Sequence, residues 1–255
     1  MEKPESQISV CVPTLNEDHN LRDCLKSVEF ADEIIVVDSG STDQTLEIAR
    51  EFTDRIYSRD WQGIARQRQF AMEQARSPWV LHLDADERIS DSLAQEIQTA
   101  LSKSPQKTAG FSMPRKTRYL GRWILHGGWY PDRKIRLVQR EFSHCRGDGL
   151  HDHIDVSGEV KALAHPIQHF TYRHLSDHLQ TMDEFSSVSL DDPSMQKIRL
   201  PALQMIVRPI AKFFSCYCLK QGFRDGLPGL IIAANSAFYV FLKHAKAWER
   251  DSGLK

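Results

Sequence analysis

Short apolar runs alternate with amphipathic segments over residues 8–101, and this alternation constrains the fold more than any other feature of the sequence. The apolar runs predict strands at 8–13, 33–38, 55–57 and 79–84, and the amphipathic segments predict helices at 16–28, 45–52, 64–75 and 90–101. Strands and helices that alternate at this spacing form βαβ units, which require a parallel sheet. We therefore expect an α/β fold.

Polar residues gather where three of the predicted strands end. Residues 14–17 (TLNE) follow the first strand, residues 38–39 (DS) close the second, and residues 84–87 (DADE) follow the fourth. In open parallel sheets, ligands bind outside the carboxyl ends of the strands. The sequence therefore predicts a single binding site at this edge of the sheet.

Asp84 and Asp86 form an acidic D-x-D pair directly after an apolar strand. Two carboxylates one residue apart at a strand end can face one cation, and such hard oxygen ligands suit Mg²⁺ or Mn²⁺. A divalent ion there would stabilise the charge of a departing diphosphate. Asp38 is placed to accept a hydrogen bond from a nucleobase, Ser39 to hold a ribose or phosphate, and Asp43 to close the turn.

Composition excludes several other classes of protein. The chain has 255 residues, 41% of them hydrophobic and 26% charged, which is typical of a folded domain. Its net charge of −1 argues against a nucleic-acid-binding protein. Five cysteines without paired spacing favour a reducing, cytoplasmic location, and we expect neither a signal peptide nor a membrane-spanning segment.

The sequence becomes apolar and basic in its last part. Two segments, LQMIVRPIAKFFSCYCL and LPGLIIAANSAFYVFL, carry lysines and arginines within or beside them. We expect Pro209, Pro228 and several glycines to prevent one long membrane span. Basic amphipathic segments of this kind lie in a membrane interface. The alternatives are a pair of core helices and a contact between two copies of the chain.

Three motifs resemble a known family. VPTLNE, IIVVDSGSTDQT and LHLDADE, in this order, are similar to the nucleotide-binding half of the family 2 glycosyltransferases, which have the GT-A nucleotide-diphospho-sugar transferase fold, a Rossmann-like mostly parallel sheet. The resemblance implies a uridine pocket, a metal and diphosphate site, and a basic position near the donor. The residues implied for the uridine pocket are Thr14, Asn16, Glu17 and Asp38. Those implied for the metal and diphosphate are Asp84 and Asp86, and the basic position near the donor is Arg66 or Arg68.

The second half resembles one branch of this family, the bacterial lipopolysaccharide core β-1,4-glucosyltransferases. In that branch an Arg-Lys-x-Arg-Leu segment is followed by a His-Glu pair. This chain has the same order, with WYPDRKIRLVQR followed by LHDHIDVSG, but position 152 carries Asp where the branch has Glu. An inverting transfer needs a carboxylate base opposite the leaving group. The resemblance implies Asp152 for this role, with Asp155 as the alternative. HPIQHFTYRHLSDHLQ and GFRDG extend the resemblance, which implies that His169 lies near the metal.

The resemblance implies an inverting enzyme that moves a hexose, glucose from UDP-glucose, onto a lipid-linked acceptor, an inner-core heptose of lipopolysaccharide. Mg²⁺ or Mn²⁺ would be the cofactor, and the protein would lie on the cytoplasmic face of the inner membrane. Arg133, Lys134 and Arg136 would line the donor or acceptor cleft. We expect a GT-A domain over 1–195, with a nucleotide-binding half at 8–101 and an acceptor half at 110–190, and an amphipathic helical region over 196–255.

Three other functions would use some of the same sequence features. A nucleotidyltransferase has a similar fold, but it carries a Gly-rich basic loop after its first strand, and VPTLNE has none. A catalytically inactive nucleotide-sugar-binding protein is favoured only by the aspartate at position 152. A zinc hydrolase would use the many histidines, yet no HExxH motif is present. The candidate zinc ligands are His144, His151, Asp152, His153, His165 and His169.

Overall fold

The computed structural model describes residues 7–103, 107–147, 152–192, 195 and 201–253. The chain forms two compact units. The first comprises Met1–Arg115 and Arg133–Phe170, and the second comprises Lys116–Asp132 and Thr171–Lys255. This division differs from the domain boundary expected after residue 195, which stays a prediction.

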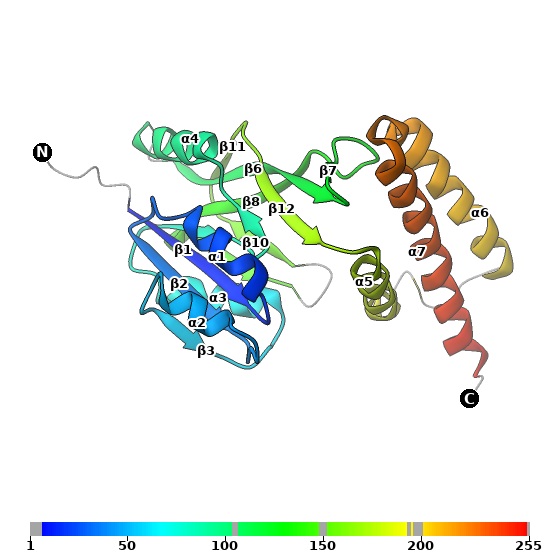
Figure 1. Ribbon diagram of the computed structural model, residues 1–255, viewed down its shortest axis with the longest axis horizontal. Coiled ribbons are helices and arrows are strands. Elements are labelled where there is room, and N and C mark those ends of the chain that lie inside the picture. Colours follow the sequence, from blue (N-terminus) through cyan, green and yellow to red (C-terminus); the bar gives the residue numbers. More distant parts are fainter. Residues whose placement is uncertain (1–6, 104–106, 148–151, 193–194, 196–200, 254–255) are drawn as a thin grey trace, which may run out of the picture. The chain divides into compact units, whose positions relative to one another are not determined.

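The first unit is built on a twisted sheet (Figure 1). Four parallel strands lie in the order β3-β2-β1-β4, with bounds β1 Ile8–Thr14, β2 Glu33–Asp38, β3 Ile56–Ser58 and β4 Trp79–His82. The sheet continues through β8 (Asp132–Gln139), which is antiparallel to β4, and then β6 (Thr108–Tyr119), β12 (Ile167–Tyr172) and β5 (Glu87–Arg88). The additional strand β11 (Glu159–Ala162) pairs with β6, and in the second unit β7 (Arg122–Trp123) pairs with Arg118 and Tyr119 at the end of β6.

Helices cover both faces of the parallel strands. They are α1 (Asp18–Lys26), α2 (Thr45–Arg50), α3 (Ile64–Gln74) and α4 (Asp91–Ser102). Successive side chains of a strand point to opposite faces. Accordingly Val10 and Val12 of β1 pack in one core cluster with Leu21 of α1, whereas Cys11 packs in the other with Ala71 of α3. The strand–helix order and the α/β class predicted from the sequence are confirmed.

A separate antiparallel hairpin lies beside α3. It consists of β9 (Ser143–Arg146) and β10 (His153–Val156), joined through residues that include 148–151, which lie outside the described part. The side chain of Gln69 on α3 accepts a hydrogen bond from the backbone N–H of Cys145 at 3.0 Å, which fixes β9 against the helix.

The second unit is mostly helical. It contains α5 (Leu175–Val188), α6 (Pro201–Phe214), a π-helical turn at Ser215–Leu219, and α7 (Gly226–Ser252), and α6 and α7 run side by side (Figure 1). Gly229 of α7 approaches the backbone of Gly222 so closely that an added Cβ would lie 1.9 Å from its carbonyl oxygen. A larger residue at position 229 would therefore force these two segments apart.

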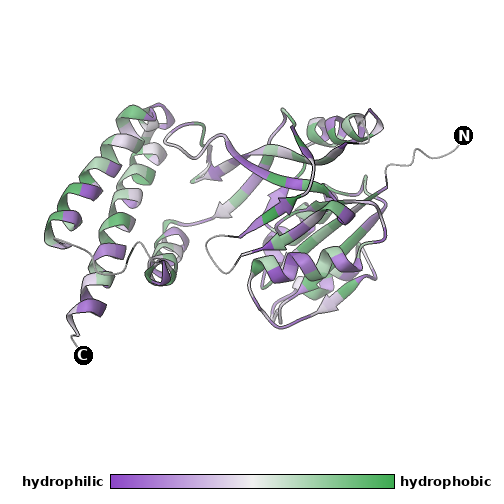
Figure 2. Ribbon diagram, turned by 180° about the vertical axis from the view of Figure 1, so that it is seen from behind, coloured by the Kyte–Doolittle hydropathy of each residue, from purple (hydrophilic) through white to green (hydrophobic). Residues whose placement is uncertain are grey.

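The expectation that prolines and glycines interrupt the last apolar segment is wrong for α7. Pro228 lies in the first turn of α7, where the missing N–H of proline removes no helical hydrogen bond. As a result Gly222–Ser252 is long and apolar enough, by length and composition, to cross a membrane, and little of its apolar window is buried. Figure 2 shows how much of α6 and α7 is hydrophobic.

Candidate active site

The ends of β1 and β2 are joined by hydrogen bonds around Asn16. This residue adopts a left-handed backbone (φ 54°), and its side-chain Oδ1 accepts a hydrogen bond from the backbone N–H of Thr42 at 2.8 Å. The backbone N–H of Asn16 donates to Oγ of Ser41 at 2.8 Å. The first helix, expected from residue 16, begins at Asp18, and its N-cap position is Glu17. Asn16 instead holds the turn after β2 against the end of β1.

Asp38 is buried at the carboxyl end of β2. Its Oδ2 accepts hydrogen bonds from the backbone N–H groups of Gly40 and Ser41, both at 3.0 Å, and its Oδ1 accepts one from Oγ of Ser41 at 2.5 Å. The carboxylate therefore shapes the turn after β2, and each of its oxygens already has a partner.

Three other residues of the predicted uridine pocket gather at the same edge. Ser39 donates its backbone N–H to the carbonyl oxygen of Thr14 at 2.9 Å, and its Oγ accepts a hydrogen bond from Gln67 at 3.0 Å. Oγ1 of Thr14 is buried and has no hydrogen-bond partner among the described residues. The N–H of Glu17 donates to Oγ1 of Thr45 at 2.8 Å. The structure thus brings together the residues that the sequence places after β1 and β2.

Asp84 lies between two arginines. Its Oδ1 accepts a hydrogen bond from Arg68 of α3 and its Oδ2 accepts one from Arg136 of β8, both at 2.5 Å. Arg136 also donates to the fully buried Glu87 at 2.8 Å, and Glu87 accepts the backbone N–H of Asp84 at 3.0 Å. These four side chains form an ion network at the D-x-D turn, in which Arg136 and Glu87 are buried and Arg68 and Asp84 are partly exposed.

The network shifts the pKa values of Asp84 and Arg136. Burial alone raises the pKa of Asp84, but the attraction of Arg136 and Arg68 outweighs it and holds that pKa well below its usual range. Burial lowers the pKa of Arg136, and the carboxylates of Asp84 and Glu87 outweigh it and raise that pKa. Burial, with the charges of the two arginines, lowers the pKa of the neighbouring His82 to about 3. His82 is therefore neutral at physiological pH.

Asp86 faces a different partner. Its Oδ2 lies 3.1 Å from Nε2 of His169 on β12, a strand whose register places His169 opposite Glu87. Two ligands at adjacent corners of an octahedral Mg²⁺ or Mn²⁺ ion lie about 3 Å apart, because each is about 2.1 Å from the ion. Asp86 and His169 therefore fit a divalent cation that takes its other ligands from phosphate and water. Asp84 fits less well, since both its oxygens accept hydrogen bonds from arginine.

Asp152 directly precedes β10, the strand that pairs with β9. On β9, burial raises the pKa of the Cys145 thiol to about 11; the charges of Arg68 and Arg136 lower that pKa, and the charges of Asp152 and Glu73 raise it. The carboxylate oxygens of Asp152 are shielded from solvent. Asp155 instead lies on β10 in a surface ion pair with Arg146, with Nε and Oδ2 3.1 Å apart.

The family model described as glycosyl transferase family 2 matches residues 9–155, more than half of the chain. The chain belongs to glycosyl transferase family 2. Its matched region contains β1 to β4, the D-x-D turn and the ion network.

Relatives of this glycosyltransferase extend the match to nearly its whole length. It is 29% identical to the lipopolysaccharide core biosynthesis glycosyltransferase LpsC of Rhizobium meliloti (strain 1021), covering 98% of this chain and 94% of that protein. It is 27% identical to an uncharacterized glycosyltransferase of Rickettsia felis, covering 98% and 91%.

A solved structure confirms the fold class. Glucosyl-3-phosphoglycerate synthase from Mycobacterium tuberculosis, in complex with phosphoglyceric acid, matches with a TM-score of 0.50 and 18% identity over 72% of this chain and 79% of that one. At this identity the likeness shows the fold alone. The GT-A fold with a helical C-terminal extension, as predicted from the sequence, is confirmed.

The histidines of this glycosyltransferase lie apart, contrary to what a zinc site requires. His165 pairs with Glu96 at 2.8 Å, and His169 pairs with Asp86. No group of three or more His, Cys, Asp or Glu side chains is placed to hold a metal ion in the described ranges, and His151 lies outside them.

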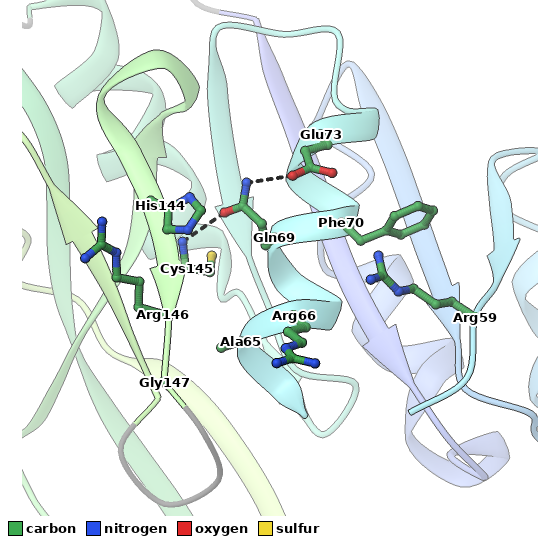
Figure 3. A pocket seen from close by; sticks show the side chains of 10 residues that line it. All are labelled: Arg59, Ala65, Arg66, Gln69, Phe70, Glu73, His144, Cys145, Arg146 and Gly147. Carbon is green, nitrogen blue, oxygen red and sulfur yellow. Dashed lines mark hydrogen bonds between the residues drawn. The ribbon is translucent and has the colours of Figure 1, made fainter. Parts of the chain in front are cut away.

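The basic residues expected around the cleft have separate roles. Arg136 is buried in the ion network rather than lining the cleft surface, and Arg133 donates to the carbonyl oxygen of Leu163 at 3.1 Å. Lys134 is half-buried on β8. Arg68 contacts Asp84, whereas Arg66 on the same helix lines a different recess (Figure 3). The predicted diphosphate contact of Arg66 stays a prediction.

Sequence reasoning missed two residues of the site. Gln67 is fully buried, and its side-chain amide joins Ser39 to the carbonyl oxygens of Arg59 and Asp60, so it holds the start of α3 against the end of β2. Glu87 supplies the second carboxylate of the network. The position of Glu87 directly after the D-x-D pair in DADE could have indicated that it belongs to the site. Gln67 lies within a helix, and nothing in the sequence around it indicated a role.

Proposed function

We propose that this family 2 glycosyltransferase transfers a hexose, glucose from UDP-glucose, with inversion, onto an inner-core heptose of lipopolysaccharide. The proposal rests on two sets of residues at the carboxyl ends of the parallel strands. One is the turn that Asp38 holds after β2, and the other is the pair of Asp86 and His169. Ligands of open α/β sheets bind at this edge.

The donor would lie along the ends of β1, β2 and β4. The buried hydroxyl of Thr14 and the turn held by Asp38 and Asn16 support a pocket for uridine. A divalent cation bound by Asp86 and His169 would neutralise charge on the leaving diphosphate. Arg68 is the cation of α3 that reaches this edge, and it is held there by Asp84.

The catalytic base in this proposal is Asp152. Its carboxylate takes the proton of the acceptor hydroxyl as that oxygen bonds to the anomeric carbon, and the bond from that carbon to the diphosphate breaks with its electron pair going to UDP. The shielded position of Asp152 beside Cys145 supports this role. Asp155 is the weaker candidate because it is exposed and paired with Arg146.

The lipopolysaccharide acceptor is supported by similarity to LpsC over nearly the whole chain. A lipid-linked acceptor requires the enzyme to work at a membrane, and α6 supports peripheral binding at the cytoplasmic face of the inner membrane. This helix exposes an apolar stripe at helical spacing: Leu203, Ile206, Val207, Ile210 and Phe214. Lysine and arginine side chains lie among the apolar residues of α6 and α7. The acidic residue between positions 201 and 248 is Asp225, and it is buried.

The test is a donor panel. The purified protein is incubated with a core oligosaccharide that ends in heptose, with Mg²⁺ or Mn²⁺, and with UDP-glucose, UDP-galactose or UDP-N-acetylglucosamine, and nucleotide release is measured. We expect UDP to be released from UDP-glucose, and we expect this release to require both the acceptor and the metal. Release in the absence of acceptor, or no release from UDP-glucose, would contradict the proposal.

A further inference from the structure

A shallow recess lies on the outer face of α3, with β9 on one side and the residues that follow β3 on the other (Figure 3). It has a volume of about 420 Å³. Three arginines from three elements line it, Arg59 after β3, Arg66 on α3 and Arg146 on β9, against the carboxylate of Glu73. All of these residues belong to the first compact unit.

The charges of this recess are only partly compensated. Arg146 pairs with Asp155, and Glu73 accepts a hydrogen bond from Gln69 at 3.0 Å. Arg59 donates to the amide oxygen of Gln62 and stacks on the ring of Phe70, with 4.5 Å from its guanidinium carbon to the ring centroid. Within the described ranges, neither Arg59 nor Arg66 forms an ion pair with a carboxylate.

The walls of the recess are fixed by buried contacts. Gln69 is anchored to the backbone of Cys145, and Ala65 and Cys145 are themselves buried. The ring of Phe70 supports Arg59, as Figure 3 shows. Planar guanidinium groups bind phosphate through paired hydrogen bonds, and two of them on a fixed wall suit a group with nearly two negative charges.

The recess is distinct from the site of the donor diphosphate. Arg66 and Arg68 are two residues apart on α3, and such residues point in directions about 200° apart around a helix. Arg68 reaches Asp84, so Arg66 points away from it. The recess also borders the hairpin strand that leads to Asp152, since Cys145 and Gly147 line it.

We propose that this recess binds a phosphate substituent of the sugar acceptor, through Arg59 and Arg66. The inference rests on the glycosyltransferase function proposed above, and it adds a recognition element that the donor site does not contain. A phosphorylated acceptor would be held there while its hydroxyl lies at Asp152.

The first test uses inorganic phosphate as the probe. Phosphate is titrated into the full-length protein, both alone and saturated with UDP and Mg²⁺, and the side-chain Nε–Hε signals of the arginines are followed by NMR. We expect saturable shifts of Arg59 and Arg66, and about tenfold weaker binding in Arg66→Ala, because one charge-assisted contact is lost. Arg76→Ala removes an exposed arginine after the end of α3 and should leave phosphate binding unchanged.

Shifts that disappear when UDP is present would assign the recess to the donor and overturn the inference, as would equal phosphate affinity in Arg66→Ala and wild type. If UDP itself fails to bind, the proposed function fails, whereas the phosphate titration still reports on the recess. Phosphatidylglycerol vesicles form a second arm: vesicle binding that Arg66→Ala abolishes would assign the recess to lipid headgroups instead.

The second test uses the transfer reaction. We expect Arg66→Ala to raise the KM for a phosphorylated core acceptor about tenfold and to leave the KM for the same acceptor after phosphatase treatment unchanged. A changed UDP affinity in this variant, with an unchanged acceptor KM, would return Arg66 to a diphosphate role and contradict the inference.

Discussion

Nε2 of His169 lies 3.1 Å from Oδ2 of Asp86, although the two residues are far apart in the sequence. The contact depends on the pairing of β12 with β5, which places His169 opposite Glu87, the residue after Asp86. The antiparallel half of the sheet therefore completes a site that the parallel half begins. Among the described residues, this is the pair to which the proposed function assigns a divalent cation.

We predict that His169→Ala weakens Mn²⁺ binding roughly tenfold or more, because one of two protein ligands is lost. Mn²⁺ affinity measured by calorimetry in the presence of UDP checks this. His165→Ala is the matched control, since His165 pairs with Glu96 away from the site. Equal Mn²⁺ affinity in His169→Ala and wild type would remove His169 from the metal site.

Arg136→Leu should destabilise the protein by about 3–5 kcal/mol, because it leaves the buried carboxylates of Asp84 and Glu87 without their shared cation. Urea unfolding of the variant and the wild type gives the difference. Arg22→Ala breaks an exposed pair with Glu51 and should change the free energy of unfolding little. A small effect in Arg136→Leu would mean that the network contributes little to stability.

The stability of the protein should fall as the pH is lowered from 6.5 towards 3, because of His82. Burial lowers the pKa of His82 from 6.5 to about 3 in the folded state, so between these values the unfolded chain binds the proton and the folded chain does not. Each pH unit in this window costs up to about 1.4 kcal/mol. The depressed pKa of Asp84 adds a loss only below about pH 4.

Urea unfolding from pH 7 to 4.5 measures the His82 contribution. We expect the slope of stability against pH to be shallower in His82→Gln than in wild type. His144→Gln, a change at an exposed position, should retain the wild-type slope. Equal slopes in all three proteins would contradict the assignment.

The exposed stripe of α6 should bind anionic membranes. We predict that Ile206→Ser combined with Ile210→Ser lowers the fraction of protein that sediments with phosphatidylglycerol vesicles severalfold, since both side chains are exposed and apolar. Val160→Ser in the first unit is the control, because it also changes an exposed apolar residue. Unchanged sedimentation of the double variant would argue for another partner of this face.

The alternation of apolar and polar residues predicted the parallel half of the fold well. Each strand of residues 8–82 and each helix up to Ser102 was predicted to within a few residues, because period-2 and period-3.6 patterns are local. Ser90 is the N-cap of α4, and its Oγ accepts the N–H of Leu93 at 3.3 Å. The pairing of β12 with β5 was not predictable, because antiparallel partners distant in sequence leave no local pattern.

The candidate site was predicted in its members more than in its contacts. The residues after β1, β2 and β4 do gather at one edge, but the partners of Asp84 could not be read from the sequence. Arg136 was expected at a cleft surface, yet it is buried on Asp84 and Glu87. A charged residue is buried only where other charges compensate it, and that compensation comes from residues distant in the chain.

The central claim, inverting hexosyl transfer with Asp152 as base, is tested most directly by analysing the acceptor itself. A heptose-containing core oligosaccharide is incubated with UDP-glucose, Mn²⁺ and either wild type or Asp152→Asn, and the product is examined by mass spectrometry and NMR. We predict one added hexose in the β configuration with wild type and none with Asp152→Asn. An α-linked product, or the same product from Asp152→Asn, would contradict the account.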